Sequence, residues 1–264
     1  MENTEKETTT GQLREDLEIL NSRYGITVEL DQTPHKKSDK IGFARHVSYD
    51  TLPYANGGLP VRTIREQLGL YPPEYIHSLK AKMIKLVRNF EESTLAGKIP
   101  EVGGVALPKQ GLMYLDIGRD YISMIELIQN LHHELSHFSD DEISGFKGRK
   151  KRTEWVRLNP EGSKAYKVVP EYFSNREIDV ERPEGFASLY GQFSPEEDRA
   201  EVAKLVMTMA RVPGYLKRMT QNDEVLNAKV QAVLAGFRAR SMGKVSGSYL
   251  EDLISGKVNE SYWD

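Results

Sequence analysis

Cysteine is absent from this chain of 264 residues. The sequence therefore excludes disulfide bonds, thiol nucleophiles and thiolate-bound metal ions, and any bound zinc must be held by histidine and carboxylate side chains. Long apolar runs are absent as well, which argues against a membrane-spanning helix. The formal net charge of -3 gives no surplus of positive charge, so a general nucleic-acid-binding protein is not expected.

The N-terminal residues lack a hydrophobic segment of the secretory kind. Residues 1–11 are polar and rich in Thr and Glu, and we predict that they form a disordered tail. A soluble protein is expected, cytoplasmic by default, while an exported mature form is also compatible with the sequence.

Composition and length together indicate a globular fold. Hydrophobic residues make up 39% of the chain and charged residues 28%, which is ordinary for a soluble protein. The sequence has no internal repeat and no linker clear enough to divide it. We therefore predict a single domain of the α+β class over residues 12–264, in which residues 12–70 could form a small N-terminal lobe.

Apolar spacing predicts the positions of the main helices and strands. Apolar residues from Ile76 to Phe90 recur three and four apart after Pro73, which predicts one long helix that ends near Phe90. Further helices are expected over residues 13–24, 121–138, 195–210 and 224–241, and strands over residues 26–30, 41–47, 104–107 and 112–117.

The helix expected over residues 121–138 carries a His-Glu-x-x-His motif. The motif runs from His133 to His137, and residues four apart lie on one face of a helix. Two imidazoles placed in this way can bind one zinc ion, and Glu134 beside the first can reach a water on that metal. Because the apolar residues of the helix fall on another side, the motif occupies its polar flank.

A catalytic zinc site usually has three protein ligands, so this motif leaves one ligand to be found. His132 points about 100° away from the first histidine of the motif. The short spacing to a third histidine that some zinc peptidases use is absent, since position 143 is Ile. A nearby acid, Asp140 or Asp141, is one candidate. A glutamate on a later helix is another, and the segment 185–201 is the best place for it.

The segment 185–201 resembles the downstream half of the gluzincin metallopeptidases. Tyr190 is followed by six residues and then by Glu197, which opens a helix, and Glu201 lies one turn further on. Related by pattern are the catalytic domain of anthrax lethal factor, the Pro-Pro endopeptidases, the Mlc titration factor and the zinc-binding metallopeptidases of bacteria. The resemblance covers roughly residues 72–210.

This resemblance implies a zincin-like metallopeptidase domain, in which a small sheet packs on the active-site helix and the C-terminal part is mostly helical. Glu197 corresponds to the third zinc ligand, Tyr190 to a residue that stabilises the oxyanion, and Glu201 to a partner of a metal-bound histidine. Many relatives have two aromatic residues where this chain has Asp198-Arg199. Glu197 and Glu201 therefore both stay candidates for the direct ligand.

The implied activity is hydrolysis of peptide bonds in a protein or peptide substrate, with zinc as the cofactor. Zinc lowers the pKa of its bound water to about 7, and Glu134 takes the proton and passes it to the leaving amine. The metal and Tyr190 stabilise the oxyanion. The resemblance also suggests that the strand over residues 112–117 pairs with an extended substrate backbone.

Other interpretations of the same residues stay open. The sequence from Ser194 to Glu197 fits a capping box, in which Glu197 would fold back on its own helix instead of facing a metal. Tyr190 could be a packed aromatic residue and Glu201 a surface acid. The basic run from Lys147 to Arg152 could be a solvated loop or a patch for an acidic partner.

Two alternatives concern the whole chain. The first is a catalytically silent zinc-binding module that recognises a protein partner. The second is a metal-free helical scaffold in which the motif occurs by chance. The presence of Glu134 and Tyr190 favours the enzyme, because a binding module has no need of a base beside the metal.

Overall fold

The computed structural model describes residues 2–42, 45–94, 97–99, 103–117, 124–141, 152–167, 182–209, 212 and 214–264. Contacts within the chain group it into two compact units, residues 1–131 and 132–264. Helix α4 (Met124–Asp141) is continuous and contributes residues to both. Among the described residues, no helix combines the length and the apolar character needed to cross a membrane. One domain over residues 12–264 stays a prediction.

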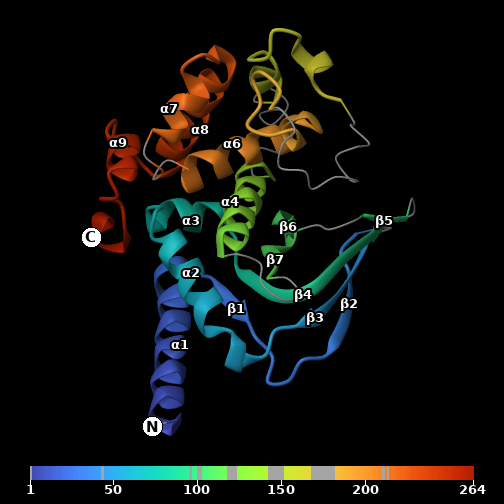
Figure 1. Ribbon diagram of the computed structural model, residues 1–264, viewed down its shortest axis with the longest axis vertical. Helices are drawn as coiled ribbons and strands as arrows, with labels where there is room; N and C mark the ends of the chain where they lie inside the picture. Colours follow the sequence, from blue (N-terminus) through green and yellow to red (C-terminus); the bar gives the residue numbers. More distant parts are fainter. Residues whose placement is uncertain are drawn as a thin grey trace. The chain divides into compact units, whose positions relative to one another are not determined.

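The first unit is built on a seven-stranded mixed sheet (Figure 1). Its strand order is β2-β3-β4-β7-β6, and β1 and β5 pair with β4 in addition. The longest strand, β4, pairs in parallel with β1 and β7 and antiparallel with β3 and β5, so it is the central strand of the sheet. The strands are β1 (Thr27–Glu29), β2 (Lys36–Lys40), β3 (His46–Thr51), β4 (Met83–Thr94), β5 (Gly97–Ile99), β6 (Gly104–Leu107) and β7 (Leu112–Asp116).

Strand β4 shows that the long helix predicted from Pro73 to Phe90 is wrong. Helix α3 (Pro73–Leu79) begins at the expected proline but ends early, because Lys80 adopts a left-handed backbone conformation with a φ of 59°. Leu86 and Phe90 are buried as expected, but they belong to strand β4. The spacing of three and four residues from Ile76 to Phe90 is compatible with a helix, but hydrogen bonding to neighbouring strands determines the extended backbone conformation.

The remaining elements of the first unit fit the sequence in part. Helix α1 (Glu2–Tyr24) ends where Gly25 adopts a positive φ of 69°, but it begins inside the segment expected to be a disordered tail. The strands expected over residues 26–30, 104–107 and 112–117 are β1, β6 and β7, whereas the one expected over 41–47 is displaced into β2 and β3. Helix α2 (Gly58–Leu68) and the 3-10 turns η1 (Tyr54–Asn56) and η2 (Pro108–Gln110) complete the unit.

Strand β7 offers no free edge to a substrate. All five of its residues pair with β4, and Leu112 to Leu115 pair with β6 on the other side. The expectation that an extended substrate backbone pairs with this strand is therefore wrong, because its backbone groups are already used within the sheet.

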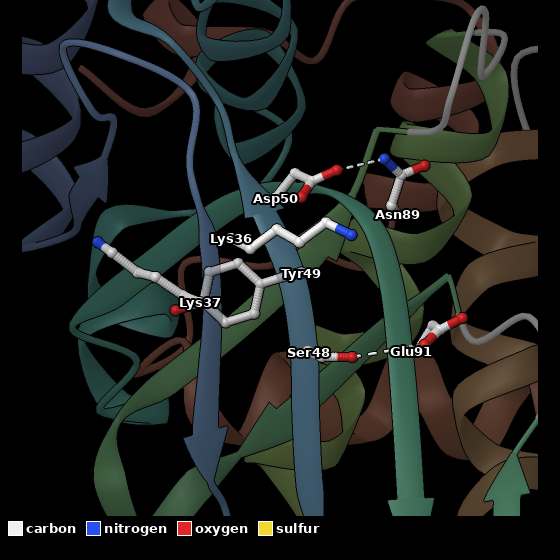
Figure 2. Close-up of a pocket in the computed structure, with 7 residues that line it drawn as sticks. All are labelled: Lys36, Lys37, Ser48, Tyr49, Asp50, Asn89 and Glu91. Carbon is white, nitrogen blue, oxygen red and sulfur yellow. Dashed lines mark hydrogen bonds between the residues drawn. The ribbon is translucent and has the colours of Figure 1, made fainter.

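A polar pocket of about 350 Å³ lies over β2, β3 and β4 (Figure 2). Several of its polar groups bind one another: the Asn89 amide nitrogen donates to Asp50 Oδ2 at 2.5 Å, and Ser48 Oγ donates to Glu91 Oε2 at 3.5 Å. None of the residues predicted to act at a metal site lines this pocket.

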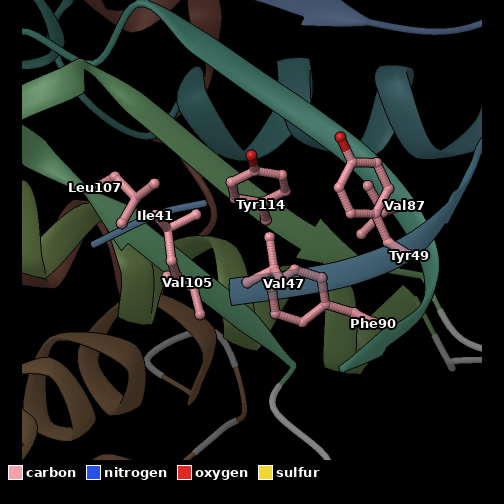
Figure 3. Packing of buried hydrophobic residues seen from close by; sticks show 8 residues of the cluster. All are labelled: Ile41, Val47, Tyr49, Val87, Phe90, Val105, Leu107 and Tyr114. Atoms are coloured by element: carbon pink, nitrogen blue, oxygen red, sulfur yellow. The ribbon is translucent and has the colours of Figure 1, made fainter. Parts of the chain in front are cut away.

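Buried side chains from β3, β4, β6 and β7 form one core cluster on the sheet (Figure 3). Within it the rings of Tyr49 and Tyr114 lie 5.5 Å apart, and both hydroxyls donate to Asp39 Oδ2, at 2.8 and 2.5 Å. Lys85 Nζ lies 3.0 Å from the same oxygen. The Asp39 carboxylate on β2 thus joins side chains of β3, β4 and β7. The members of the core cluster are Ile41, Val47, Tyr49, Val87, Phe90, Val105, Leu107 and Tyr114.

The second unit is mostly helical (Figure 1). The helices expected over residues 195–210 and 224–241 are α6 (Pro195–Met209) and α8 (Glu224–Arg240). The described residues of their predicted apolar faces are buried, except Val225, which is half-buried. With a small sheet before them and a helical C-terminal part, the predicted α+β class is confirmed. Other elements are α7 (Tyr215–Thr220), α9 (Tyr249–Ile254), η3 (Gly162–Ala165), η5 (Tyr190–Gln192) and η6 (Glu260–Trp263).

Candidate metal centre

Helix α4 carries the His-Glu-x-x-His motif on a flank that is itself enclosed. Its apolar residues Leu131, Leu135 and Phe138 are at most 2% exposed, as the apolar stripe predicts. His133 and Glu134 are also buried, at 8% and 6% exposure. A buried imidazole and a buried carboxylate are costly without partners, so this flank needs neighbours that bind them.

Glu197, in the first turn of α6, is such a neighbour for the two histidines. Nε2 of His133 lies 3.2 Å from Nε2 of His137 and 3.0 Å from Oε2 of Glu197. The third side of the triangle, from His137 Nε2 to Glu197 Oε2, is 3.5 Å. Ligand atoms about 2.05 Å from a tetrahedral zinc ion are about 3.3 Å apart, so all three sides fit such an ion.

Glu197 faces the histidines although its helix is capped by the predicted serine. Ser194 Oγ accepts a hydrogen bond from the Glu197 backbone nitrogen at 3.2 Å. The carboxylate points to the imidazoles, where Oε2 is buried and has no hydrogen-bond partner among the described residues. When both imidazoles are neutral and direct their lone pairs at it, this buried oxygen has no donor, which costs free energy. Either a proton on a histidine or a cation between the three ligand atoms would satisfy it. These residues therefore fit a zinc ion.

Glu201 holds His133 from the opposite side of the ring. Its Oε1 lies 2.8 Å from His133 Nδ1, so the nitrogen that faces away from the three-atom triangle has a carboxylate partner. The other oxygen of Glu201 accepts from Ser188 Oγ and pairs with Lys204 Nζ, both at 2.6 Å. This arrangement orients the ring and leaves Nε2 directed at the triangle.

The electrostatics of the centre follow from these contacts. Burial lowers the pKa of His133, but contact with Glu197 and Glu201 outweighs burial and raises that pKa to about 10. Burial raises the pKa of Glu197, while the two histidines bring it down to about 2. Without a metal, the neutral-pH site therefore holds a protonated His133 beside an ionised Glu197. A metal ion would replace that proton, so its binding would release protons.

Glu134 and Tyr190 lie close to the same histidines. The charge of Glu134 contributes to the raised pKa values of both His133 and His137. The Tyr190 ring centroid is 5.7 Å from that of His133, and the Tyr190 ring also stacks with that of Phe193, with the centroids 6.1 Å apart. The structure thus brings together a base and a phenol beside the candidate ligands.

The remaining candidates are placed differently. His132 is buried, and it does not belong to the group formed by His133, His137 and Glu197. The side chains of Asp140 and Asp141 lie outside the described residues, as do residues 147–151 of the basic run. Arg152, the last residue of that run, pairs with Glu196 at 3.3 Å.

Sequence reasoning missed Ser188 and Lys204, the two residues that contact Oε2 of Glu201. Lys204 follows Glu201 by three positions on α6, and this helical spacing could have indicated the pair. Ser188 gave no signal, because its contact depends on how the chain turns before α6.

Comparison with known proteins supports the fold. No protein-family model matches the chain, and no curated protein is similar to it. A solved structure from Bacteroides caccae, described as a "putative zinc-binding metallo-peptidase", is 13% identical and has a TM-score of 0.56. The match covers 97% of this chain and 94% of the other. At this identity the similarity concerns the fold alone, and the fold is metallopeptidase-like, as predicted.

Proposed function

We propose that this protein is a zinc-dependent peptidase of the gluzincin type. The observation that carries the proposal is the triangle formed by His133 Nε2, His137 Nε2 and Glu197 Oε2, whose sides of 3.0 to 3.5 Å suit one tetrahedral zinc ion. The Bacteroides caccae structure of this fold, described as a "putative zinc-binding metallo-peptidase", supports the same interpretation.

The ligands would be His133, His137 and Glu197, with Glu201 as the partner of His133. When bound, zinc supplies Lewis acidity and a water of lowered pKa. Two histidines and one glutamate leave a tetrahedral ion one open position, which is the arrangement of a catalytic site and not of a structural one. The donor set also matches a chain without cysteine.

Glu134 and Tyr190 perform the proton transfer and the charge stabilisation in this proposal. Glu134 accepts a proton from the attacking water and delivers it to the leaving amine of the cleaved peptide bond. The Tyr190 hydroxyl donates a hydrogen bond to the oxyanion that develops on the substrate carbonyl. The substrate is a protein or peptide.

Metal analysis and peptide cleavage test this function in turn. Purified protein should contain about one zinc ion per chain, and His133→Ala should lose it. Wild type should cut members of a peptide library derived from a proteome, and Glu134→Gln should cut none while it keeps its zinc. A chain without zinc under metal-replete conditions would contradict the proposal. A zinc-loaded chain that cuts nothing would favour the zinc-binding module.

A further inference from the structure

Lys229 of helix α8 is a charged side chain with no exposure to solvent. Its Nζ lies 2.7 Å from Asp198 Oδ2, and both side chains are 0% exposed. The same nitrogen donates to the Gly185 carbonyl oxygen at 2.6 Å and lies 4.0 Å from the centroid of the Phe186 ring. A single ammonium group thus binds two segments, one at Gly185 and one at Asp198.

The Asp198 carboxylate that pairs with Lys229 also accepts hydrogen bonds from two other side chains. The Trp155 indole nitrogen and the Tyr166 hydroxyl both donate to its Oδ2, each at 2.9 Å. Burial opposes both charges, since it raises the pKa of Asp198 and lowers the pKa of Lys229. Buried ion pairs seldom increase stability over apolar side chains of similar volume, so a role in fixing geometry is the stronger explanation.

Both the backbone carbonyl and the backbone nitrogen of Gly185 make hydrogen bonds to side chains at or near the start of α8. Its carbonyl accepts from Lys229, and its nitrogen donates to Asp223 Oδ2 at 2.8 Å. Gly185 has a φ of +80°, and a Cβ at this position would lie 2.9 Å from a methyl carbon of Val225. Helix α8 therefore fixes the backbone at Gly185 through Asp223, Val225 and Lys229.

Both segments that Lys229 binds lead directly into the candidate metal centre. Asp198 follows Glu197 in the first turn of α6. Three residues after Gly185 stands Ser188, which donates to Glu201, and two residues after that comes Tyr190. On one side the ammonium group binds Asp198, the residue next to Glu197. On the other side it binds Gly185, three residues before Ser188, which contacts the Glu201 partner of His133.

We propose that Lys229 is a positioning residue of the metal centre. It joins Asp198 to Gly185 and so sets the distance between the α6 turn that carries Glu197 and the segment that carries Ser188 and Tyr190. This inference rests on the proposed function, because it assumes that Glu197 is a metal ligand. It explains why Asp198 and Lys229 are charged although both are buried.

The test compares zinc affinity with stability in the full chain. Lys229→Met alone would leave the Asp198 carboxylate buried without its partner, so the informative variant is Lys229→Met combined with Asp198→Asn. That double variant removes both charges and keeps an oxygen acceptor for Trp155 and Tyr166. Zinc affinity is measured by competition with a chelator, far below the melting temperature of each metal-free protein. We expect the double variant to bind zinc about tenfold more weakly than wild type.

Val233→Ala is the matched control, since Val233 is buried one turn further along α8 and its truncation should destabilise the fold without touching the pair. Weaker zinc binding in the double variant, but not in the control, supports positioning. Unchanged affinity in the double variant, or an equal loss in the control, overturns it. Should the double variant not fold, Lys229→Gln combined with Asp198→Asn, which also removes both charges, decides by the same comparison. Wild type without zinc would instead overturn the proposed function.

Discussion

Glu197 and Glu201 contact opposite nitrogens of one imidazole ring. Glu197 Oε2 lies 3.0 Å from Nε2 of His133, and Glu201 Oε1 lies 2.8 Å from Nδ1. A neutral imidazole donates from one ring nitrogen and accepts at the other. If Nδ1 donates to Glu201, the lone pair of Nε2 is free for a metal. Glu197 approaches on this Nε2 side of the ring. The geometry therefore favours Glu197 as the ligand and Glu201 as the partner.

Replacement of these two glutamates by glutamine should give different losses of zinc. Glu197→Gln removes a charged ligand, so zinc should be lost under competition with a chelator that wild type withstands. Glu201→Gln removes only the acceptor for His133 and should weaken zinc binding by about ten- to hundredfold. Zinc content after dialysis and competition titrations measure both effects.

Glu196→Gln is the matched control for these variants. Glu196 stands in the same turn of α6, but its side chain is 38% exposed and pairs with Arg152. Its replacement should leave zinc affinity unchanged. A larger loss in Glu201→Gln than in Glu197→Gln would reverse the two assignments.

At the residue scale, the sequence predicted the parts of the centre that lie close together along the chain. His133, Glu134 and His137 belong to one helix, so their relative placement follows from helical geometry. Glu197 was assigned through a resemblance, since nothing local places α6 against α4. The pair of Asp198 and Lys229 was not predicted at all, because a buried charge looks like a solvated one until the packing is known.

The first turn of α6 combines a cap with a candidate ligand. Ser194 Oγ accepts from the Glu197 backbone nitrogen, whereas the Glu197 carboxylate points to the histidines. The serine half of the predicted capping box is therefore present, but the Glu197 side chain does not fold back on its own helix as the capping interpretation expected. The cap uses the backbone of Glu197 and leaves its side chain to the metal centre.

Ser194→Ala should lower the free energy of unfolding by about 1 kcal/mol, because the Glu197 nitrogen would lose its acceptor. Ser194→Asp should restore most of this loss, since aspartate caps equally well and its charge suits a helix N-terminus. Urea denaturation of the metal-free proteins measures both. Equal stability of the alanine variant and wild type would show that the cap contributes nothing.

At the element scale, spacing predicted burial better than it predicted backbone conformation. The helices α6 and α8 were found because their apolar faces repeat over several turns. Between Pro73 and Phe90 the same spacing misled, because the chain turns at Lys80 and β4 then pairs with strands far away in sequence. Because β1 and β7 are distant in sequence, a short apolar pattern within residues 73–90 does not indicate that β4 pairs with them.

For the whole molecule, the location of the candidate centre within one compact unit has a measurable consequence. All four groups, His133, His137, Glu197 and Glu201, belong to residues 132–264. Removal of zinc by a chelator should therefore lower amide-exchange protection in α6 and in the C-terminal half of α4, and leave β4 and β7 protected. At a free zinc concentration of 100 times the dissociation constant, the metal contributes about 2.7 kcal/mol. Hydrogen exchange followed by mass spectrometry tests this, and uniform loss across both units would contradict it.

The central position of β4 also bears on how the first unit folds. The pairs β2–β3, β4–β5 and β6–β7 join neighbours in sequence and can form early as hairpins. By contrast, Thr27 pairs with Met83, and His46 pairs with Ser93, only after long loops have closed, which makes these contacts slow to form. Until then β4, the longest strand, has long unpaired edges. The chain is therefore most prone to aggregate during synthesis or refolding, before β1, β3 and β7 have joined it.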